Sequence, residues 1–266
     1  MTAEYRGNKG FLQRDSVEHE GYAEVQSTDH REGKERGGAS DLMEAILDRN
    51  NLNRAYQRVK RNRGAAGIDG MTVEEALPWL KEHKGELLQN IREGSYMPSP
   101  VRRKEIPKPD GGVRKLGIPT VVDRVIQQAI AQKLQNIWEP LFSDSSYGYR
   151  PNRSAQQAVR QVKRYAEQGY RYTVSVDLSK YFDTLNHELL MDLLHRQIQD
   201  MRVLGLIKKY LKSGVLENGI VCKTEKGSPQ GGPLSPLLAN IYLNEFDWEM
   251  RRRGVRMVRY ADDIVV

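Results

Sequence analysis

The chain has 266 residues, of which 38% are hydrophobic, and it carries a net charge of +7 with a pI near 9.3. This length allows one large domain or two smaller ones, each with its own core. No apolar run is long enough to span a bilayer, and the N-terminus lacks a signal-peptide core, so we expect no membrane association. Cys222 is the only cysteine, which excludes an intrachain disulfide and a cysteine-based zinc site and suits a reducing, cytoplasmic setting.

The charge is unevenly distributed along the chain. Residues 1–40 hold 6 basic and 8 acidic residues with few apolar ones, and we expect a disordered leader there. The other 226 residues hold 36 basic and 27 acidic residues, and the excess is concentrated in residues 54–63 and 102–115. Mild basic excess is usually only solvated surface, but concentrated excess suggests a polyanionic partner.

The first half of the chain predicts helices and one hairpin. An amphipathic helix is expected from Asp41 to about Asn62, with Ser40 as its N-cap, and a Gly-rich segment at 64–70 ends it. Thr72 and Glu75 predict a capping box for the next helix, which Pro78 should interrupt or restart. Residues 101–106 and 113–118 flank a Pro-Asp-Gly-Gly turn and predict a β-hairpin.

The second half mixes helices with short strands. Helices are expected at about 121–138, from Ser154 to near Gly169 with a second capping box at Gln157, at 187–197, at 201–213 and at 237–252. A strand pair is expected around 215–224, followed by a Pro- and Gly-rich loop at 227–236. Helices mixed with antiparallel pairs point to the α+β class.

Three aspartates stand at strand ends far apart in the chain. Asp177 closes an alternating strand in which Val174 and Val176 share one face, and Asp262 and Asp263 lie in a tight turn between strand-like arms. Taken singly, such aspartates are more often structural, because Asp is common in turns. Taken together they would supply the oxygen ligands that a pair of Mg²⁺ ions needs for phosphoryl transfer.

Several motifs resemble those of reverse transcriptases, and in particular the bacterial group II intron-encoded subgroup, also called maturases. The residues that carry the resemblance are Gly67-Ile68-Asp69-Gly70, Ile106 to Arg114, Tyr147-Gly148-Tyr149-Arg150-Pro151, Asp177 to Asp183, Ser228 to Pro236 and Tyr260-Ala261-Asp262-Asp263. Their order and rough spacing match those of the family, and the match covers about residues 41–266.

The resemblance implies a right-hand polymerase fold with an antiparallel palm sheet. Residues 41–170 would be mainly fingers, with RNA-binding helices and a nucleotide-binding hairpin, and residues 171–266 mainly palm, with the thumb absent after the final hairpin. It implies that Asp177, Asp262 and Asp263 hold two Mg²⁺ ions, aided by the main-chain carbonyl of Leu178.

The resemblance also implies residues for substrate binding. Phe182 matches the steric gate that selects deoxynucleotides, although an aromatic at this place is often only core. Lys108 and Arg114 match fingers cations that grip a triphosphate, where the alternative is a solvated charged hairpin. Gln230 matches a residue that contacts the incoming nucleotide, and Arg102 matches one that touches the templating base.

Other residues remain open between two interpretations. Tyr147, Tyr149 and Arg150 could contact single-stranded template RNA or could equally be buried packing. His187 and His195 lack partner ligands and are expected at the surface or in packing.

The leading hypothesis is a group II intron RNA-directed DNA polymerase, with the intron RNA as template, a DNA primer and target, and dNTPs as substrates. The alternatives are a truncated, non-catalytic RNA-binding maturase fragment and a retron-type reverse transcriptase. A homodimer is left open, as is whether the chain is active without the thumb that clamps the duplex.

Overall fold

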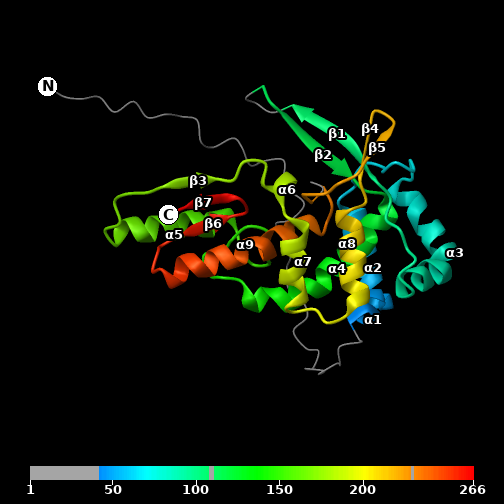
Figure 1. Cartoon of the computed structure of the whole chain (residues 1–266), viewed down its shortest axis with the longest axis horizontal. Helices are drawn as coiled ribbons and strands as arrows, with labels where there is room; N and C mark the ends of the chain where they lie inside the picture. The colour runs from blue at the N-terminus through cyan, green and yellow to red at the C-terminus, as the bar shows by residue number, and fades with distance from the viewer. Residues whose placement is uncertain (1–41, 108–110, 229–230) are drawn as a thin grey trace.

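The computed structural model describes residues 42–107, 111–228 and 231–266. The predicted leader and Ser40 therefore lie outside the described residues. A three-stranded sheet lies towards one end of the molecule, a four-stranded sheet projects near the other, and helices fill the space between them (Figure 1). Among the helices described, none is both long and apolar enough to cross a membrane.

The first predicted helix is in fact two helices. Helix α1 spans Leu42–Leu47 and α2 spans Arg49–Arg61, with Asp48 between them in an extended conformation. The Asp48 carboxylate accepts hydrogen bonds from the backbone N–H groups of Asn50 and Asn51 and so caps α2. The prediction of one continuous helix was wrong because this carboxylate competes for the local backbone donors. The inner face expected for this segment comprised Leu42, Ile46, Leu52, Ala55, Tyr56 and Val59. Four of these residues are buried, and Leu42 and Leu52 are half-buried against the same core.

Helix α3 spans Val73–Arg92 and begins with the predicted capping box of Thr72 and Glu75. The prediction that Pro78 breaks this helix was wrong, because α3 runs through it without interruption. Proline removes one main-chain donor, and the rest of this 20-residue helix keeps its own hydrogen bonds.

The predicted hairpin is confirmed, with β1 at Val101–Pro107 and β2 at Val113–Ile118 in antiparallel register. The predicted strand pair near 215–224 is also confirmed as β4 (Val215–Glu217) and β5 (Ile220–Cys222). Strand β4 pairs in parallel with β1, which makes one sheet in the order β2-β1-β4-β5. Chain segments on both sides of residue 170 thus share a sheet, and the division into fingers and palm at that residue stays a prediction.

The remaining helices follow the predicted ranges closely. They are α4 (Val121–Trp138), a short 3₁₀ turn (Glu139–Leu141), α5 (Ala155–Glu167), α7 (His187–His195), α8 (Met201–Leu211) and α9 (Ser235–Arg252). Most of the first ten residues of α4 are buried, and its apolar side chains join those of α1, α2, α7, α8 and α9 in one core. Val258 of the other sheet packs in a separate, smaller cluster with Tyr147 and Ala158.

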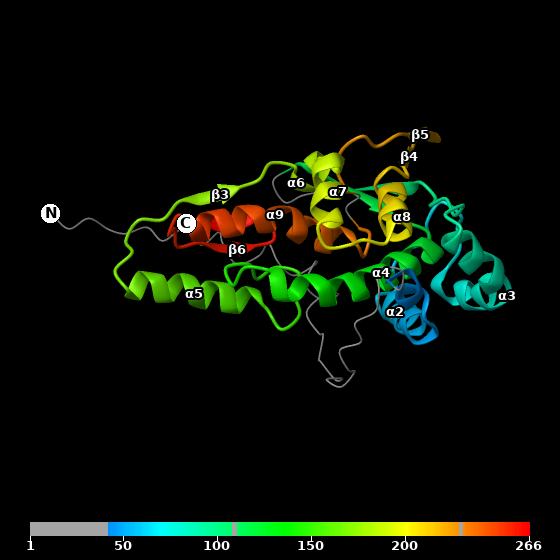
Figure 2. The same ribbon diagram turned by 60° about the horizontal axis from the view of Figure 1, so that its bottom comes forward.

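The second sheet has the order β3-β7-β6, with β3 at Ser175–Asp177, β6 at Val258–Tyr260 and β7 at Asp263–Val265. Helices α5 and α9 lie alongside this sheet in both views (Figure 2). A short helix that the sequence did not predict, α6 (Tyr181–Thr184), follows β3. The mixture of helices with two largely antiparallel sheets confirms the α+β class.

Candidate active site

The three-stranded sheet brings the predicted aspartates to one place. Strand β3 pairs antiparallel with β7 so that Asp177 stands directly opposite Asp263. Directly opposed residues point to the same face of a sheet, with Cβ atoms about 4.5–5.5 Å apart. Ile264 and Val176 form the neighbouring pair, and Ile264 is buried on the other face. Asp262 lies in the two-residue turn between β6 and β7, after Ala261, whose backbone is left-handed with φ of 56°.

The electrostatics of Asp262 reflect its neighbours. Burial raises the pKa of the Asp262 carboxyl, and the negative charge of Asp177 raises it further, whereas the positive charges of Arg114 and Arg259 act in the opposite direction. The partly buried Asp262 carboxylate is repelled by that of Asp177, and a divalent cation bound between them would offset this repulsion. Arg114 belongs to β2, so the β1–β2 hairpin reaches the vicinity of the carboxylates.

The donor set fits Mg²⁺, which prefers carboxylate oxygens from more than one backbone segment. In the conformation described, no three carboxylate, imidazole or thiol groups among the described residues are already close enough to hold one ion together. The pair Asp177 and Asp262 interact, and Asp263 stands opposite Asp177 on the outer face.

Phe182 lies on α6, and a backbone contact to the Gly-rich loop holds it in place. The N–H of Ser228 donates to the Phe182 carbonyl at 2.7 Å, and the N–H of Gly227 donates to the Leu185 carbonyl at 2.8 Å. A Cβ on Gly227 would lie 2.8 Å from the carbonyl oxygens of Phe182 and Asp183, so only glycine fits there. His187, which the sequence predicted at the surface or in packing, is buried with Nε2 2.6 Å from the Gly227 carbonyl.

Tyr149 packs its ring edge-on against Phe182, with ring centroids 6.5 Å apart and an interplanar angle of 73°. Its backbone is left-handed, with φ of 55°. For a residue with a side chain this conformation costs on the order of 1–2 kcal/mol. The flanking residues fix it, because Gly148 packs on the backbone of Tyr260 and Ala261, and Arg150 is buried. The sequence named Tyr149 but gave no sign of its contact with Phe182.

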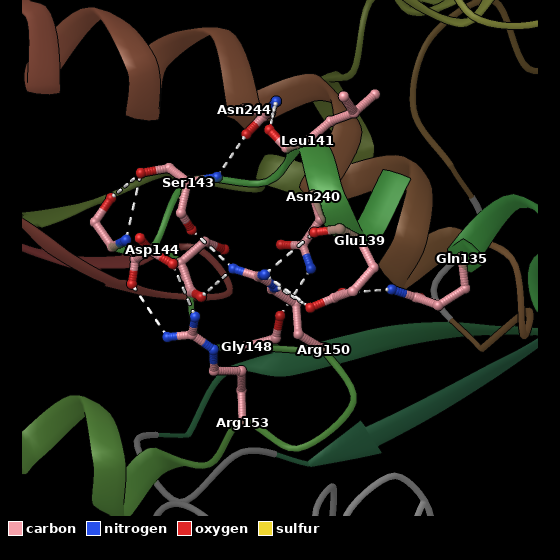
Figure 3. A network of polar contacts seen from close by, with 12 residues as sticks. Gln135, Glu139, Leu141, Ser143, Asp144, Gly148, Arg150, Arg153, Asn240 and Asn244 are labelled. Atoms are coloured by element: carbon pink, nitrogen blue, oxygen red, sulfur yellow. Dashed lines mark hydrogen bonds and ion pairs between the residues drawn. The ribbon is translucent and has the colours of Figure 1, made fainter. Parts of the chain in front are cut away.

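For Tyr147 and Arg150 the structure supports the interpretation as buried packing residues. Both are buried, and the Arg150 guanidinium donates to the Glu139 carboxylate at 2.7 Å and to the carbonyls of Ser143 and Ser146 (Figure 3). The Arg150 side chain is thus committed to holding residues 139–146, and Tyr147 packs with Ala158 of α5 and Val258 of β6. Of the three, Tyr149 is the one whose ring contacts Phe182.

The other predicted binding residues are placed as follows. Lys108 and Gln230 lie outside the described residues. Next to Gln230, a Cβ on Gly231 would lie 2.6 Å from the Gly117 carbonyl, so that loop abuts β2. Arg102 donates two hydrogen bonds to the Ala66 carbonyl, at 3.1 and 2.7 Å. Its guanidinium therefore pins the 64–70 loop, and its contact with a templating base stays a prediction.

The fold is that of the fingers and palm of a nucleic acid polymerase, and comparison with known proteins specifies the family. Residues 106–266 match the sequence model described as "Reverse transcriptase (RNA-dependent DNA polymerase)". The chain belongs to the reverse transcriptase family. It is 43% identical over 194 residues to the group II intron-encoded protein LtrA of Lactococcus lactis subsp. cremoris, and 41% identical over 191 residues to protein YkfC of Escherichia coli K12. These relatives confirm the resemblance to group II intron reverse transcriptases and maturases.

Each alignment covers only part of the relative. The LtrA alignment covers 73% of this chain and 32% of LtrA, and the YkfC alignment covers 70% of this chain and 50% of YkfC. Among solved structures, a partial Cas6-RT-Cas1–Cas2 complex matches with a TM-score of 0.55 at 21% identity, over 84% of this chain and 37% of that one. That structural likeness supports the fold alone.

Proposed function

We propose that the chain carries the nucleotidyl-transfer site of a group II intron RNA-directed DNA polymerase, which joins dNTPs to a primer 3′-hydroxyl on an RNA template. The single observation that supports this proposal best is the strand register. It sets Asp177 opposite Asp263, next to a turn in which Asp262 feels the charge of Asp177.

Asp177, Asp262 and Asp263 would hold two Mg²⁺ ions, which when bound neutralise charge on the attacking and leaving oxygens. Arg114 would bind the triphosphate through its forked guanidinium, together with Lys108 and Gln230. The Phe182 ring would lie beneath the sugar, where a 2′-hydroxyl would collide with it. Intron RNA and target DNA would be the partners.

Primer extension tests the proposal directly. The chain is incubated with a DNA primer on an RNA template, dNTPs and Mg²⁺, and labelled products are resolved by size. We expect extension by the unaltered chain and none by Asp177→Ala or Asp262→Ala, while Asp183→Ala, a neighbouring carboxylate without an assigned role, keeps activity. RNA binding without any extension under these conditions would instead support a non-catalytic RNA-binding protein.

A further inference from the structure

Arg259 is a fully buried cation whose every donor has a partner. Its side chain has 0% exposure, as has that of Asp247, with which it forms a two-pronged ion pair at 2.8 and 2.6 Å. The remaining N–H groups donate to Ser146 Oγ, to Asn240 Oδ1 and to the Ala261 carbonyl, at 2.8, 2.9 and 2.8 Å. An arginine has five N–H donors, so this guanidinium is completely used.

The partners of Arg259 come from elements that are far apart in the sequence. Asp247 and Asn240 belong to α9, Ser146 belongs to the loop before α5, and Ala261 begins the catalytic turn. The Arg259 backbone adds two more bonds, from its N–H to the Ser145 carbonyl and from the Tyr147 N–H to its own carbonyl, each at 2.8 Å. The guanidinium thus sits where three segments meet.

A second bond closes the cluster around the turn. Asn240 Nδ2 donates to the Gly148 carbonyl at 2.7 Å (Figure 3), and Gly148 lies directly against the Ala261 backbone. In the turn that carries Asp262, Arg259 therefore binds the Ala261 carbonyl, and Gly148 packs against the Ala261 amide nitrogen. Ala261 sits in a left-handed conformation that few residues with a side chain adopt unless the surroundings enforce it.

Stability alone is a weak explanation for such a cluster. Well-packed apolar side chains can commonly replace a buried ion pair without loss of stability, because removing two charges from water is costly. Apolar side chains, however, cannot donate a hydrogen bond to a backbone carbonyl. The bond that distinguishes Arg259 from an apolar substitute is the one to Ala261, immediately before the acidic doublet.

We infer that Arg259, held by Asp247 and Asn240, is the positioning residue that fixes the backbone of the Ala261–Asp262 turn so that the carboxylates of Asp262 and Asp263 meet Asp177. This inference rests on the proposed function, since it assigns the cluster to the same metal-binding carboxylates. Arg259 itself touches neither substrate nor the reacting atoms.

The decisive variant is the double change Arg259→Met with Asp247→Leu, which removes both charges together and keeps the volume roughly constant. We expect it to fold, with amide hydrogen exchange at Asp262 and Asp263 accelerated about 10-fold or more as the turn loses its anchor. We also expect the Mg²⁺ concentration for half-maximal extension to rise and the extension rate to fall by about 100-fold, as for a displacement of roughly 1 Å.

A matched control changes another charged pair away from the turn. Arg202→Met with Asp200→Leu removes an ion pair at the start of α8, where Asp200 is largely buried. This control should lower stability without altering amide exchange at residues 262–263 or the Mg²⁺ dependence. If the Arg259 double variant does not fold, Asn240→Ala decides instead, because it cuts only the links to Arg259 and Gly148 and should show the same changes to a smaller degree.

Two outcomes would overturn the inference. One is a folded double variant whose extension rate and Mg²⁺ dependence stay within twofold of the unaltered chain. The other is unchanged amide exchange in the turn. Failure of the proposed function would look different, since the unaltered chain would not extend a primer or Asp262→Ala would extend it equally well. Amide exchange and Mn²⁺ binding followed by electron paramagnetic resonance still test the positioning role in that case.

Discussion

Gly148→Ala probes how tightly the turn that carries Asp262 is packed. The new Cβ would lie 2.2 Å from the Ala261 amide nitrogen, 3.0 Å from its Cα and 3.1 Å from the Tyr260 carbonyl carbon. All three atoms are backbone, so no side-chain rotation can relieve the clash. Ordinary van der Waals contact begins at 3.4 Å, and the two segments must therefore separate by about 1.2 Å. Gly148 is not in the left-handed region, so the strain is steric rather than conformational.

The expected cost follows from that displacement. Overpacking of this kind destabilises a protein by about 1–3 kcal/mol. A shift of about 1 Å in a catalytic group can lower the rate about 100-fold. We therefore expect Gly148→Ala to fold, to melt a few degrees lower and to lose most primer extension, as measured by thermal unfolding and by extension on an RNA template.

Gly85→Ala is the matched control. Gly85 lies on the exposed side of α3 with no atom within 4 Å of the added Cβ, and alanine favours a helix over glycine by roughly 0.5–1 kcal/mol. This control should melt slightly higher and extend primers normally. The reasoning is refuted if Gly148→Ala keeps an extension rate within twofold of this control, because the turn would then tolerate the displacement.

Three further changes test separate parts of the site. Asp262→Asn should raise the melting temperature in EDTA at pH 7. The pKa of Asp262 is raised in the folded state, so ionisation of this carboxyl costs stability as pH rises. The gain from the substitution should vanish below about pH 3.9, and an equal gain at pH 3 would contradict the prediction. Phe182→Val should increase ribonucleotide relative to deoxyribonucleotide incorporation about 10-fold or more, measured in single-nucleotide extension, and an unchanged ratio would argue against the steric gate. Thr72→Ala should cost about 1 kcal/mol in denaturant unfolding by removing the cap of α3, with primer extension unaffected, and a loss of extension would tie α3 to the site.

Local signals in the sequence predicted most elements correctly. The capping boxes at Thr72 and Ser154 and the turn between β1 and β2 are short motifs whose chemistry is complete within a few residues. Helix α4 has the predicted limits because Thr120 caps it and an apolar pattern continues to Trp138. The break at Asp48 was missed because a helix-compatible pattern continues on both sides of the capping side chain.

The pairing of distant segments could not be predicted in the same way. The parallel contact of β4 with β1 joins residues more than a hundred positions apart, and no local pattern specifies it. Metal chemistry and the strand ends grouped Asp177 with Asp262 and Asp263, but no local pattern specified that Asp177 would stand opposite Asp263. The Arg259 cluster gave no signal, since Ser146, Asn240 and Asp247 are ordinary polar residues until the fold brings them together.

One segment of the chain contacts two parts of the candidate site. Residues 146–150 contact the turn that carries Asp262 through Gly148 and the Phe182 ring through Tyr149, and Arg150 anchors the same segment to Glu139. Because these are adjacent residues with fixed backbone geometry, a movement of the turn that carries Asp262 also moves the ring that backs Phe182. Under the proposed function, one segment would thus set both the placement of the carboxylates and the shape of the space beneath the sugar, and a change at Gly148 should alter both rate and nucleotide selection.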